Sequence, residues 1–172
     1  SRNGSTIYFF DDIDSNSVAE AIKYIDILES QKVKGITIIL NSCGGEEYSG
    51  LALSHRMRAS KPRFPTIGTG FVASMALIVY LGGDRRIATK NARFLNHQGS
   101  TEIGGKSTDI KIESQEMEAM ENICINIMAE RTKQDPKKLK NSIKIGNKYM
   151  SASEAKAQGF VHEIIDEVKK GR

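Results

Sequence analysis

Short apolar segments alternate along this chain with longer segments of helical periodicity. Near-continuous runs of β-branched residues, such as residues 36–40, are typical of parallel strands that are covered on both faces. Strands and helices follow one another in a regular order, which favours right-handed βαβ crossovers and a mostly parallel sheet in an α/β fold. Strands are expected at residues 6–10, 36–40, 66–69, 86–88, 94–96 and 160–164, with a further short strand where Ile110 and Ile112 alternate with charged residues.

Capping residues and glycines predict where the helices begin and end. Ser17 and Ser151 each precede a glutamate by three positions, which is the capping-box pattern of a helix start. Asp135 before Pro136 predicts another start, and Gly159 predicts the end of the helix that begins near Ser151. Helices are therefore expected from about residue 17 to 28, at 48–58, up to 81 after Ser74, at 113–132, after 135, and from 151 to 158.

The predicted helix at 113–132 is the longest, and it is apolar on more than one side. Ile123 and Ile125 lie off its main apolar stripe. Such a helix either lies in the middle of a core or is held between subunits, and we favour the subunit interface. The stripe itself consists of Met117, Met120, Cys124, Ile127 and Met128.

Composition limits the classes of function. A chain of 172 residues with 39% hydrophobic and 27% charged residues is expected to form one domain, 1–172. The net charge of +4 has one local excess, the lysines of 135–140, and a solvated helix face explains it better than a nucleic-acid site. Cys43 and Cys124 make neither a disulfide framework nor a zinc site. We expect no metal, no membrane span and a cytoplasmic location, or an organelle matrix if a transit peptide has been removed.

Three features carry candidate chemistry. Ser74 lies in a turn of small residues after a predicted strand, and His97 ends a later strand between polar neighbours. Gly44 and Gly45 follow another strand directly. Each has an ordinary interpretation alone: a helix cap, a hydrogen-bonded histidine and a tight turn. Together they indicate a serine nucleophile, its general base and a backbone oxyanion hole.

The spacing of these features resembles the proteolytic subunit of the Clp protease family across nearly the whole chain. That resemblance implies a crotonase-like fold and self-association into heptameric rings, stacked in pairs as a tetradecamer. The region of about 99–133 would be the handle, a strand and helix that protrude between rings. The segments that carry the resemblance are Leu40–Gly45, Gly70–Met75, Asn91–Gln98, Ser107–Ile110 and Met150–Gly159.

The resemblance also implies roles for individual residues. Ser74 would be the nucleophile and His97 the general base of a serine endopeptidase that cleaves unfolded polypeptides or peptides. No cofactor is expected, and ATP would be used only by a partner Clp-type ATPase. The backbone N–H groups of Gly45 and Met75 would form the oxyanion hole, and an extended peptide would bind along Gly44, Gly99, Ser100 and Thr101.

The chain departs from the family pattern at several positions. Asn147 stands where the family has the aspartate of the catalytic triad, and Gly146 stands where an arginine makes contacts between rings. An amide can accept a hydrogen bond from His97 but cannot stabilise an imidazolium by charge, so weak or conditional activity is expected. Thr37 and Ile39 replace tyrosines of the cleft at which a Clp ATPase docks, which argues against such a partner.

Three alternatives to an active Clp-type peptidase remain open at this point. The chain could be a catalytically impaired subunit of a mixed Clp ring, which the asparagine at 147 favours. It could be a phage head-maturation protease on the same fold. An acyl-CoA enzyme of the crotonase superfamily is the least favoured, because such enzymes do not need a serine–histidine pair at these positions.

Overall fold

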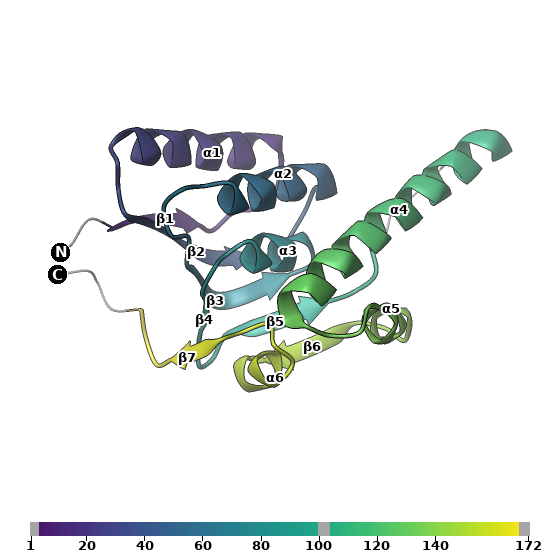
Figure 1. Cartoon of the computed structure of the whole chain (residues 1–172). Helices are drawn as coiled ribbons and strands as arrows, with labels where there is room; N and C mark the ends of the chain where they lie inside the picture. The colour runs from purple at the N-terminus through teal and green to yellow at the C-terminus, as the bar shows by residue number, and fades with distance from the viewer. Residues whose placement is uncertain (1–3, 100–103, 169–172) are drawn as a thin grey trace.

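The computed structural model describes residues 4–99 and 104–168, which form one seven-stranded sheet with helices packed on it (Figure 1). Strands β1, β2, β3, β4 and β7 lie in that order and all pair in parallel, as the alternating pattern predicts. The strands are β1 (Gly4–Phe9), β2 (Gly35–Ser42), β3 (Thr66–Ala73), β4 (Arg86–Thr89), β5 (Arg93–Asn96), β6 (Lys148–Ser151) and β7 (Glu163–Ile165).

The long strand β3 has two partners on the same side. Its first residues, 66–68, pair with β4, and its last residues, 71–73, pair in parallel with β5. Strand β6 then extends this second branch by antiparallel pairing with β5. The branch places the ends of β3 and β5 beside one another, and these ends carry Ser74 and His97.

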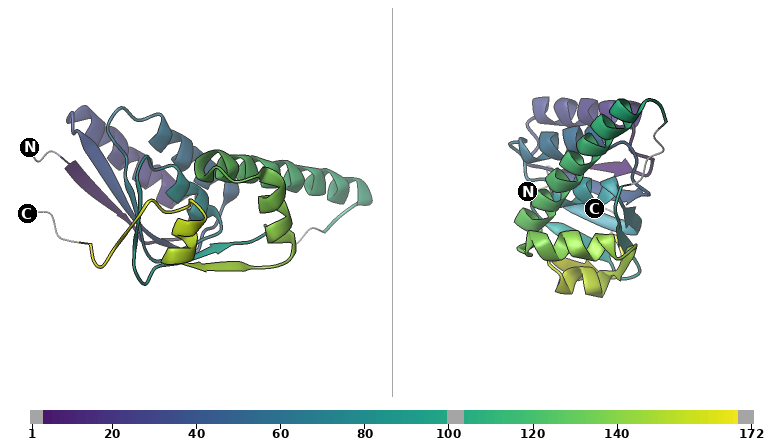
Figure 2. Two further views of the ribbon diagram at one scale, coloured as in Figure 1. Left: turned by 60° about the horizontal axis from the view of Figure 1, so that its bottom comes forward. Right: turned by 90° about the vertical axis from the view of Figure 1, so that its right-hand side faces the viewer.

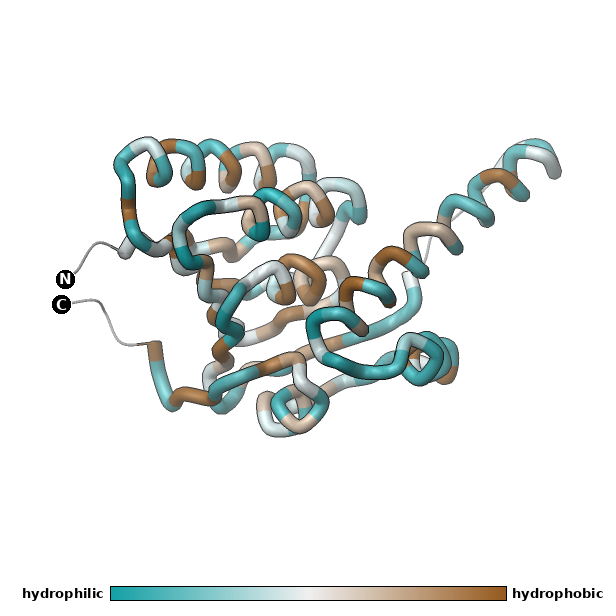
Figure 3. Tube along the Cα trace, in the orientation of Figure 1, coloured by the Kyte–Doolittle hydropathy of each residue, from teal (hydrophilic) through white to brown (hydrophobic). Residues whose placement is uncertain are grey.

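The first three helices lie together, and the longest helix protrudes (Figure 2). Helices α1, α2 and α3 lie side by side on one face of the sheet, whereas α4 runs out beyond the body of the molecule. Hydrophobic positions gather in the strands and in α3, and the far end of α4 is mainly hydrophilic (Figure 3). The helices are α1 (Ser15–Ser30), α2 (Glu47–Arg58), α3 (Met75–Leu81), α4 (Ser107–Thr132), α5 (Pro136–Lys144) and α6 (Ala152–Ala157).

Every residue of α3 is buried, so this short helix is the centre of the core. Its last turn is fixed to the sheet by Tyr80, whose hydroxyl donates to the Ile87 carbonyl at 2.9 Å. The hydroxyl of Thr66 donates in turn to the Tyr80 carbonyl at 2.9 Å. Burial raises the pKa of Tyr80, which keeps the phenol protonated as a donor.

Two arginines fasten the C-terminal end of α4 to the body. The Arg86 guanidinium, from β4, donates to the carbonyls of Phe160, Gly159 and Arg131 at 2.8 to 3.1 Å. Arg131 donates from Nε to the Leu81 carbonyl at 2.8 Å. Burial and the neighbouring Arg131 lower the pKa of Arg86 to about 10, so the side chain remains charged at neutral pH. These bonds satisfy carbonyls at helix ends that would otherwise be left unpaired.

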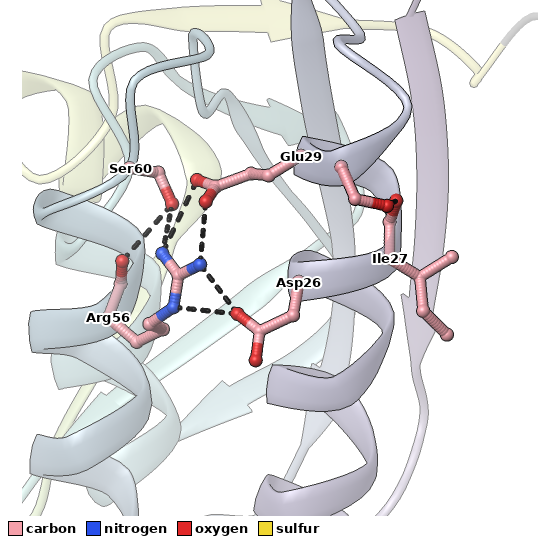
Figure 4. A network of polar contacts seen from close by, with 6 residues as sticks. Asp26, Ile27, Glu29, Arg56 and Ser60 are labelled. Carbon is pink, nitrogen blue, oxygen red and sulfur yellow. Dashed lines mark hydrogen bonds and ion pairs between the residues drawn. The ribbon is translucent and has the colours of Figure 1, made fainter.

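A second network joins α1 to α2 near the surface (Figure 4). Arg56 contacts Asp26 and Glu29 of α1, each at 2.7 Å, and also Ser60 at 2.8 Å. The hydrogen bond from Arg56 lowers the pKa of Glu29. Arg56 and Glu29 are only partly buried and Asp26 is exposed, so these contacts align the two helices more than they stabilise the fold.

Three sequence predictions about the elements are wrong. Helix α1 is capped by Asp14, whose carboxylate accepts from the backbone N–H groups of Asn16 and Ser17, so Ser17 is the third helical residue of the capping box rather than its cap. The expected strand around Ile110 and Ile112 is helical and belongs to α4, which begins at Ser107. The last strand begins only at Glu163.

Other predictions about the helices are confirmed. Asp135 caps α5 through the N–H of Lys137, and Ser151 forms the capping box that starts α6. Along α4 the predicted stripe is buried at Met120, Ile127 and Met128 and only partly buried at Met117 and Cys124. Ile125, which was placed off the stripe, is also buried.

Candidate active site

Ser74 stands in a strained turn between β3 and α3. Its φ of 54° and ψ of −127° are unfavourable for a residue with a side chain. The backbone holds this geometry on both sides, because the Ser74 N–H donates to Leu95 at 3.0 Å and its carbonyl accepts from Leu77 at 2.9 Å. The hydroxyl makes no capping bond to α3. The interpretation of Ser74 as an ordinary helix cap is therefore wrong, and its Oγ is left available for other chemistry.

The glycines after β2 pack directly against this turn. A Cβ on Gly44 would lie 2.8 Å from the Ser74 Cβ and 2.9 Å from the N of Met75, so only glycine fits. Gly45 has a φ of 143°, and a Cβ there would lie 2.1 Å from the carbonyl oxygen of Ile13. Ile13 pairs with the turn through the Gly44 carbonyl at 2.8 Å and the Glu46 N–H at 2.7 Å. These two bonds do not use the N–H of Gly45.

His97 follows β5 immediately, and Asn147 immediately precedes β6. The last paired residues of these antiparallel strands are Asn96 and Lys148, so one step further along the ladder brings His97 and Asn147 opposite each other. His97 is half-buried and Asn147 is exposed. Within the described parts of the chain, no hydrogen bond joins the His97 ring to Ser74 or to Asn147. The third position therefore lies next to the ladder that ends at the base, and no hydrogen bond joins it to the base within the described residues.

A cleft of about 330 Å³ opens beside the serine, between the end of the sheet and helices α4 and α5. Of the predicted site residues, Ser74, Met75, His97 and Gly99 line it together. Gly44, Gly45 and Asn147 do not line it, although Gly44 contacts Ser74 from behind. The predicted peptide-binding residues Ser100 and Thr101 lie outside the described residues.

Sequence analysis missed the charged groups of this cleft, which are Glu47, Glu118, Glu121, Lys140 and Lys144. Lys140 Nζ lies 3.6 Å from Glu118 and 3.9 Å from Glu121, and the Gln98 amide donates to Glu121 at 2.7 Å. Burial raises the pKa of Glu47. The one available signal was the position of Glu47, two residues after the glycine turn.

Cys124 also lines the cleft but is not a competing nucleophile. Burial, together with the charges of Glu47 and Glu121, raises the pKa of its thiol to about 12. The thiolate is the reactive form, so this cysteine is inert at neutral pH. Within residues 4–99 and 104–168, no group of three or more His, Cys, Asp or Glu side chains could hold a metal ion. In the same residues, no helix combines the length and the apolar character needed to cross a membrane.

Comparison with known proteins agrees with this arrangement. The family model described as "Clp protease" matches residues 2–168. An ATP-dependent Clp protease proteolytic subunit of Deinococcus radiodurans is 28% identical over 163 residues, covering 93% of this chain and 79% of the relative. The proteolytic subunit 3 of Rhizobium etli is 32% identical over 162 residues, covering 93% of this chain and 83% of the relative.

Among solved structures, an asparagine-to-aspartate mutant of ClpP1 from Listeria monocytogenes superposes with a TM-score of 0.86 at 28% identity. The match covers 94% of this chain and 91% of that chain. The mostly parallel α/β arrangement is therefore the expected crotonase-like fold. From the family match and these relatives we conclude that this chain belongs to the Clp protease family of serine peptidases.

Proposed function

We propose that this chain is a serine endopeptidase of the Clp proteolytic-subunit type, acting on unfolded polypeptides or short peptides inside a ring-shaped assembly. The observation that carries the proposal is the strained turn of Ser74 and Met75, against which Gly44 packs closely, and which lines the same cleft as His97. Strain of this kind persists only where surrounding structure maintains it, and it is concentrated at functional sites.

The reaction follows from these positions. His97 accepts the Ser74 proton as Oγ attacks the carbonyl carbon of the scissile peptide bond. The N–H groups of Gly45 and Met75 donate to the oxyanion of the tetrahedral intermediate, and one such donor contributes about 3 kcal/mol in other enzymes. His97 then protonates the leaving amine, and water hydrolyses the acyl-enzyme by the same steps in reverse. The peptide would pair by strand addition with the segment that includes Gly99.

Asn147 is the weak component of this mechanism. The residues next to it and to His97, Lys148 and Asn96, are the last pair of the β5–β6 ladder, which supports an orienting role. A neutral amide leaves the developing imidazolium without a compensating charge, and in the well-studied serine protease example an asparagine at this place lowers turnover by about 10⁴. We therefore propose slow catalysis that depends on how His97 is held in the assembled ring.

Ring assembly is proposed from the family and from α4. Ile110, Ile112 and Ile123 are 40%, 62% and 42% exposed on this helix, which is more apolar surface than a solvated helix needs. We propose that heptameric rings stack in pairs through this helix. We also propose a cytoplasmic protein that needs no cofactor for peptide cleavage, with any ATP use confined to a Clp-type ATPase partner.

Active-site labelling tests the proposal. The assembled protein is incubated with a fluorophosphonate and analysed by intact mass and peptide mapping, with an active Clp peptidase as a positive control. One adduct per chain, located on Ser74 and absent from Ser74→Ala, is expected. If the assembled protein acquires no adduct while the control is labelled, the peptidase proposal is wrong.

The second candidate function is that of a non-catalytic ring subunit, which the unbonded pair of His97 and Asn147 favours. This candidate predicts stable rings with no labelling of Ser74. It also predicts that mixing with an active relative produces mixed rings. Size-exclusion chromatography of the protein, alone and mixed, checks the ring assembly that both functions require, and the labelling of Ser74 separates them.

A further inference from the structure

Glu47 occupies an unusual place for a carboxylate, on the first turn of α2 beside the proposed oxyanion hole. Gly50, three residues later, lies so close to Met75 that an added Cβ would be 2.3 Å from the Met75 Cγ. Residues three apart share a face of a helix, so Glu47 lies on the face of α2 that covers Met75. Its Oε1 also lies 3.0 Å from where a side chain on Gly99 would begin. The carboxylate therefore lies between the oxyanion-hole residue and the proposed peptide-binding segment.

The other carboxylates of the cleft have a cation nearby, whereas Lys144, which also lines it, forms no ion pair among the described residues. Lys140 lies near Glu118 and Glu121, and Glu121 also accepts a hydrogen bond from Gln98. In the described parts of the chain, Glu47 has no ion pair and no side-chain hydrogen bond, although it lines the same cleft as Ser74. It is thus a carboxylate without a cation, next to the reaction centre.

An uncompensated carboxylate at this place opposes the chemistry. Negative charge develops on the oxyanion beside Met75, and a second negative charge nearby raises the energy of that transition state. A cation supplied by the substrate would remove the repulsion and would also bind the carboxylate directly. The benefit would be larger in the transition state than in the bound substrate, which is the condition for faster turnover.

We propose that Glu47 is a specificity-determining residue that selects peptides with a lysine or arginine next to the scissile bond. This inference rests on the proposed peptidase function and assigns the substrate class to the same cleft. Lys144, which also lines the cleft, is the group that could favour acidic substrates instead.

The test compares two fluorogenic peptides that differ only in charge, with lysine or Nε-acetyl-lysine on the N-terminal side of the scissile bond. With the assembled full chain, kcat/KM for the lysine peptide should exceed that for the acetyl-lysine peptide about fivefold, the upper range for a partly exposed ion pair. Glu47→Gln should bring the ratio close to one. Glu46→Gln is the matched control, because the neighbouring Glu46 carboxylate accepts from Ser49 at 2.7 Å and does not line the cleft.

Binding of the same peptides to Ser74→Ala, measured by fluorescence anisotropy, separates this inference from the proposed function. Tighter binding of the lysine peptide, lost in Ser74→Ala with Glu47→Gln, supports the inference even if no cleavage occurs. Equal cleavage and equal binding of both peptides would overturn it while leaving the peptidase intact. A ratio that Glu47→Gln does not change, or a preference for an aspartate peptide, would also overturn it.

Discussion

The two halves of the candidate active site are built in different ways. The nucleophile half, Ser74 with Gly44 and Gly45, is enclosed by β3, β5 and the buried helix α3, and its positive φ angles are held by backbone bonds on both sides. The base half consists of His97 and Asn147 at the open end of a two-strand ladder. The chain's own packing thus determines the position of the nucleophile, whereas the position of the base depends on short-range pairing.

The difference shows what a single folded chain can prepare for catalysis. Backbone donors and a strained serine are parts of the fold itself, so they are present before any substrate arrives. Orientation of a histidine requires a bonded partner, and Asn147 is exposed, next to a glycine with open space around it. This half needs a charge, a substrate or a neighbouring subunit to complete it.

The largest effect is expected at the nucleophile. Ser74→Ala should lower peptide hydrolysis by the assembled protein at least about 10³-fold, because no other group can form the acyl-enzyme. Ser114→Ala, a serine that lines the same cleft, should retain most of the activity. Steady-state hydrolysis of a fluorogenic peptide checks both variants, and equal loss in the two would argue against Ser74 as nucleophile.

The glycine turn should be the next most sensitive position. Gly45→Ala should destabilise the fold by about 3 kcal/mol and lower activity about 10²-fold, because its Cβ would collide with the Ile13 carbonyl and displace an oxyanion donor. Gly146→Ala is the matched control: its φ of 142° is almost the same as the 143° of Gly45, but nothing lies within 4 Å.

The control should lose only about 1 kcal/mol, from backbone strain alone. Chemical denaturation and peptide hydrolysis give both quantities for each variant. Similar losses of stability in the two would show that the collision at Gly45 is relieved by movement of the turn.

The base half should respond to the aromatic contact that holds β6. Phe71 and Tyr149 stack with ring centroids 6.4 Å apart and planes 12° apart, which fixes β6 two residues from Asn147. Tyr149→Ala should lower Tm by about 3 °C and reduce activity further than that loss of stability explains. Tyr24→Ala, at an exposed tyrosine on α1 that makes no aromatic pair among the described residues, is the control for loss of an aromatic surface residue. Unchanged activity in Tyr149→Ala would show that β6 does not position the base.

The smallest effect is expected at His162, which lies outside the site. Its titration should change the stability of the fold at low pH without involving the catalytic residues. Partial burial, with the charges of Arg86 and Arg131, lowers the pKa of His162 below 6.5, and its Nδ1 accepts from the Arg86 N–H at 3.2 Å. The unfolded chain therefore binds a proton more readily than the folded one. The free energy of unfolding should fall as the pH drops below about 6.5 and through the lowered pKa.

His162→Asn should flatten that dependence, because its amide oxygen can still accept from Arg86 but does not titrate. His55→Asn is the matched control, because His55 is exposed on α2 and is not part of the contact between His162 and Arg86. Denaturant unfolding at several pH values measures the slope for each protein. An unchanged slope in His162→Asn would assign the pH dependence to other groups.

Many of the strands and helices could be predicted from local sequence features, namely apolar runs and capping residues. Strand β2 and helix α3 are near-continuous apolar runs, and Asp135 and Ser151 cap their helices as the residue types predict. Asp14 was missed because Ser17, three residues later, is followed by Glu20 and so also fits the capping-box pattern. In the structure Ser17 is instead the third helical residue of the box that Asp14 begins. The alternation of Ile110 and Ile112 with charged residues wrongly predicted a strand. Both residues are exposed on α4, and where no face of a helix is buried the spacing of apolar residues does not indicate the secondary structure.

The site was predictable only in part, for a similar reason. Ser74, His97 and the glycines lie directly after strands, and the ends of neighbouring strands meet in space, so sequence order places them. Glu47 lies in the cleft because α2 packs on Met75. This is a tertiary contact, and no local sequence pattern predicts it. The branch of β3 between β4 and β5 likewise depends on pairing across the sheet.

The most direct test of the comparison is the effect of Asn147→Asp on the rate at which a fluorophosphonate acylates Ser74 in the assembled protein. If the nucleophile half is complete and the base half lacks only a charge, the acylation rate constant should rise at least about tenfold at neutral pH, with unchanged ring assembly. Asn141→Asp, an exposed asparagine on α5, adds the same charge elsewhere and should leave the rate unchanged. An equal or lower rate in Asn147→Asp would contradict the account, because it would show that asparagine at this position does not limit His97.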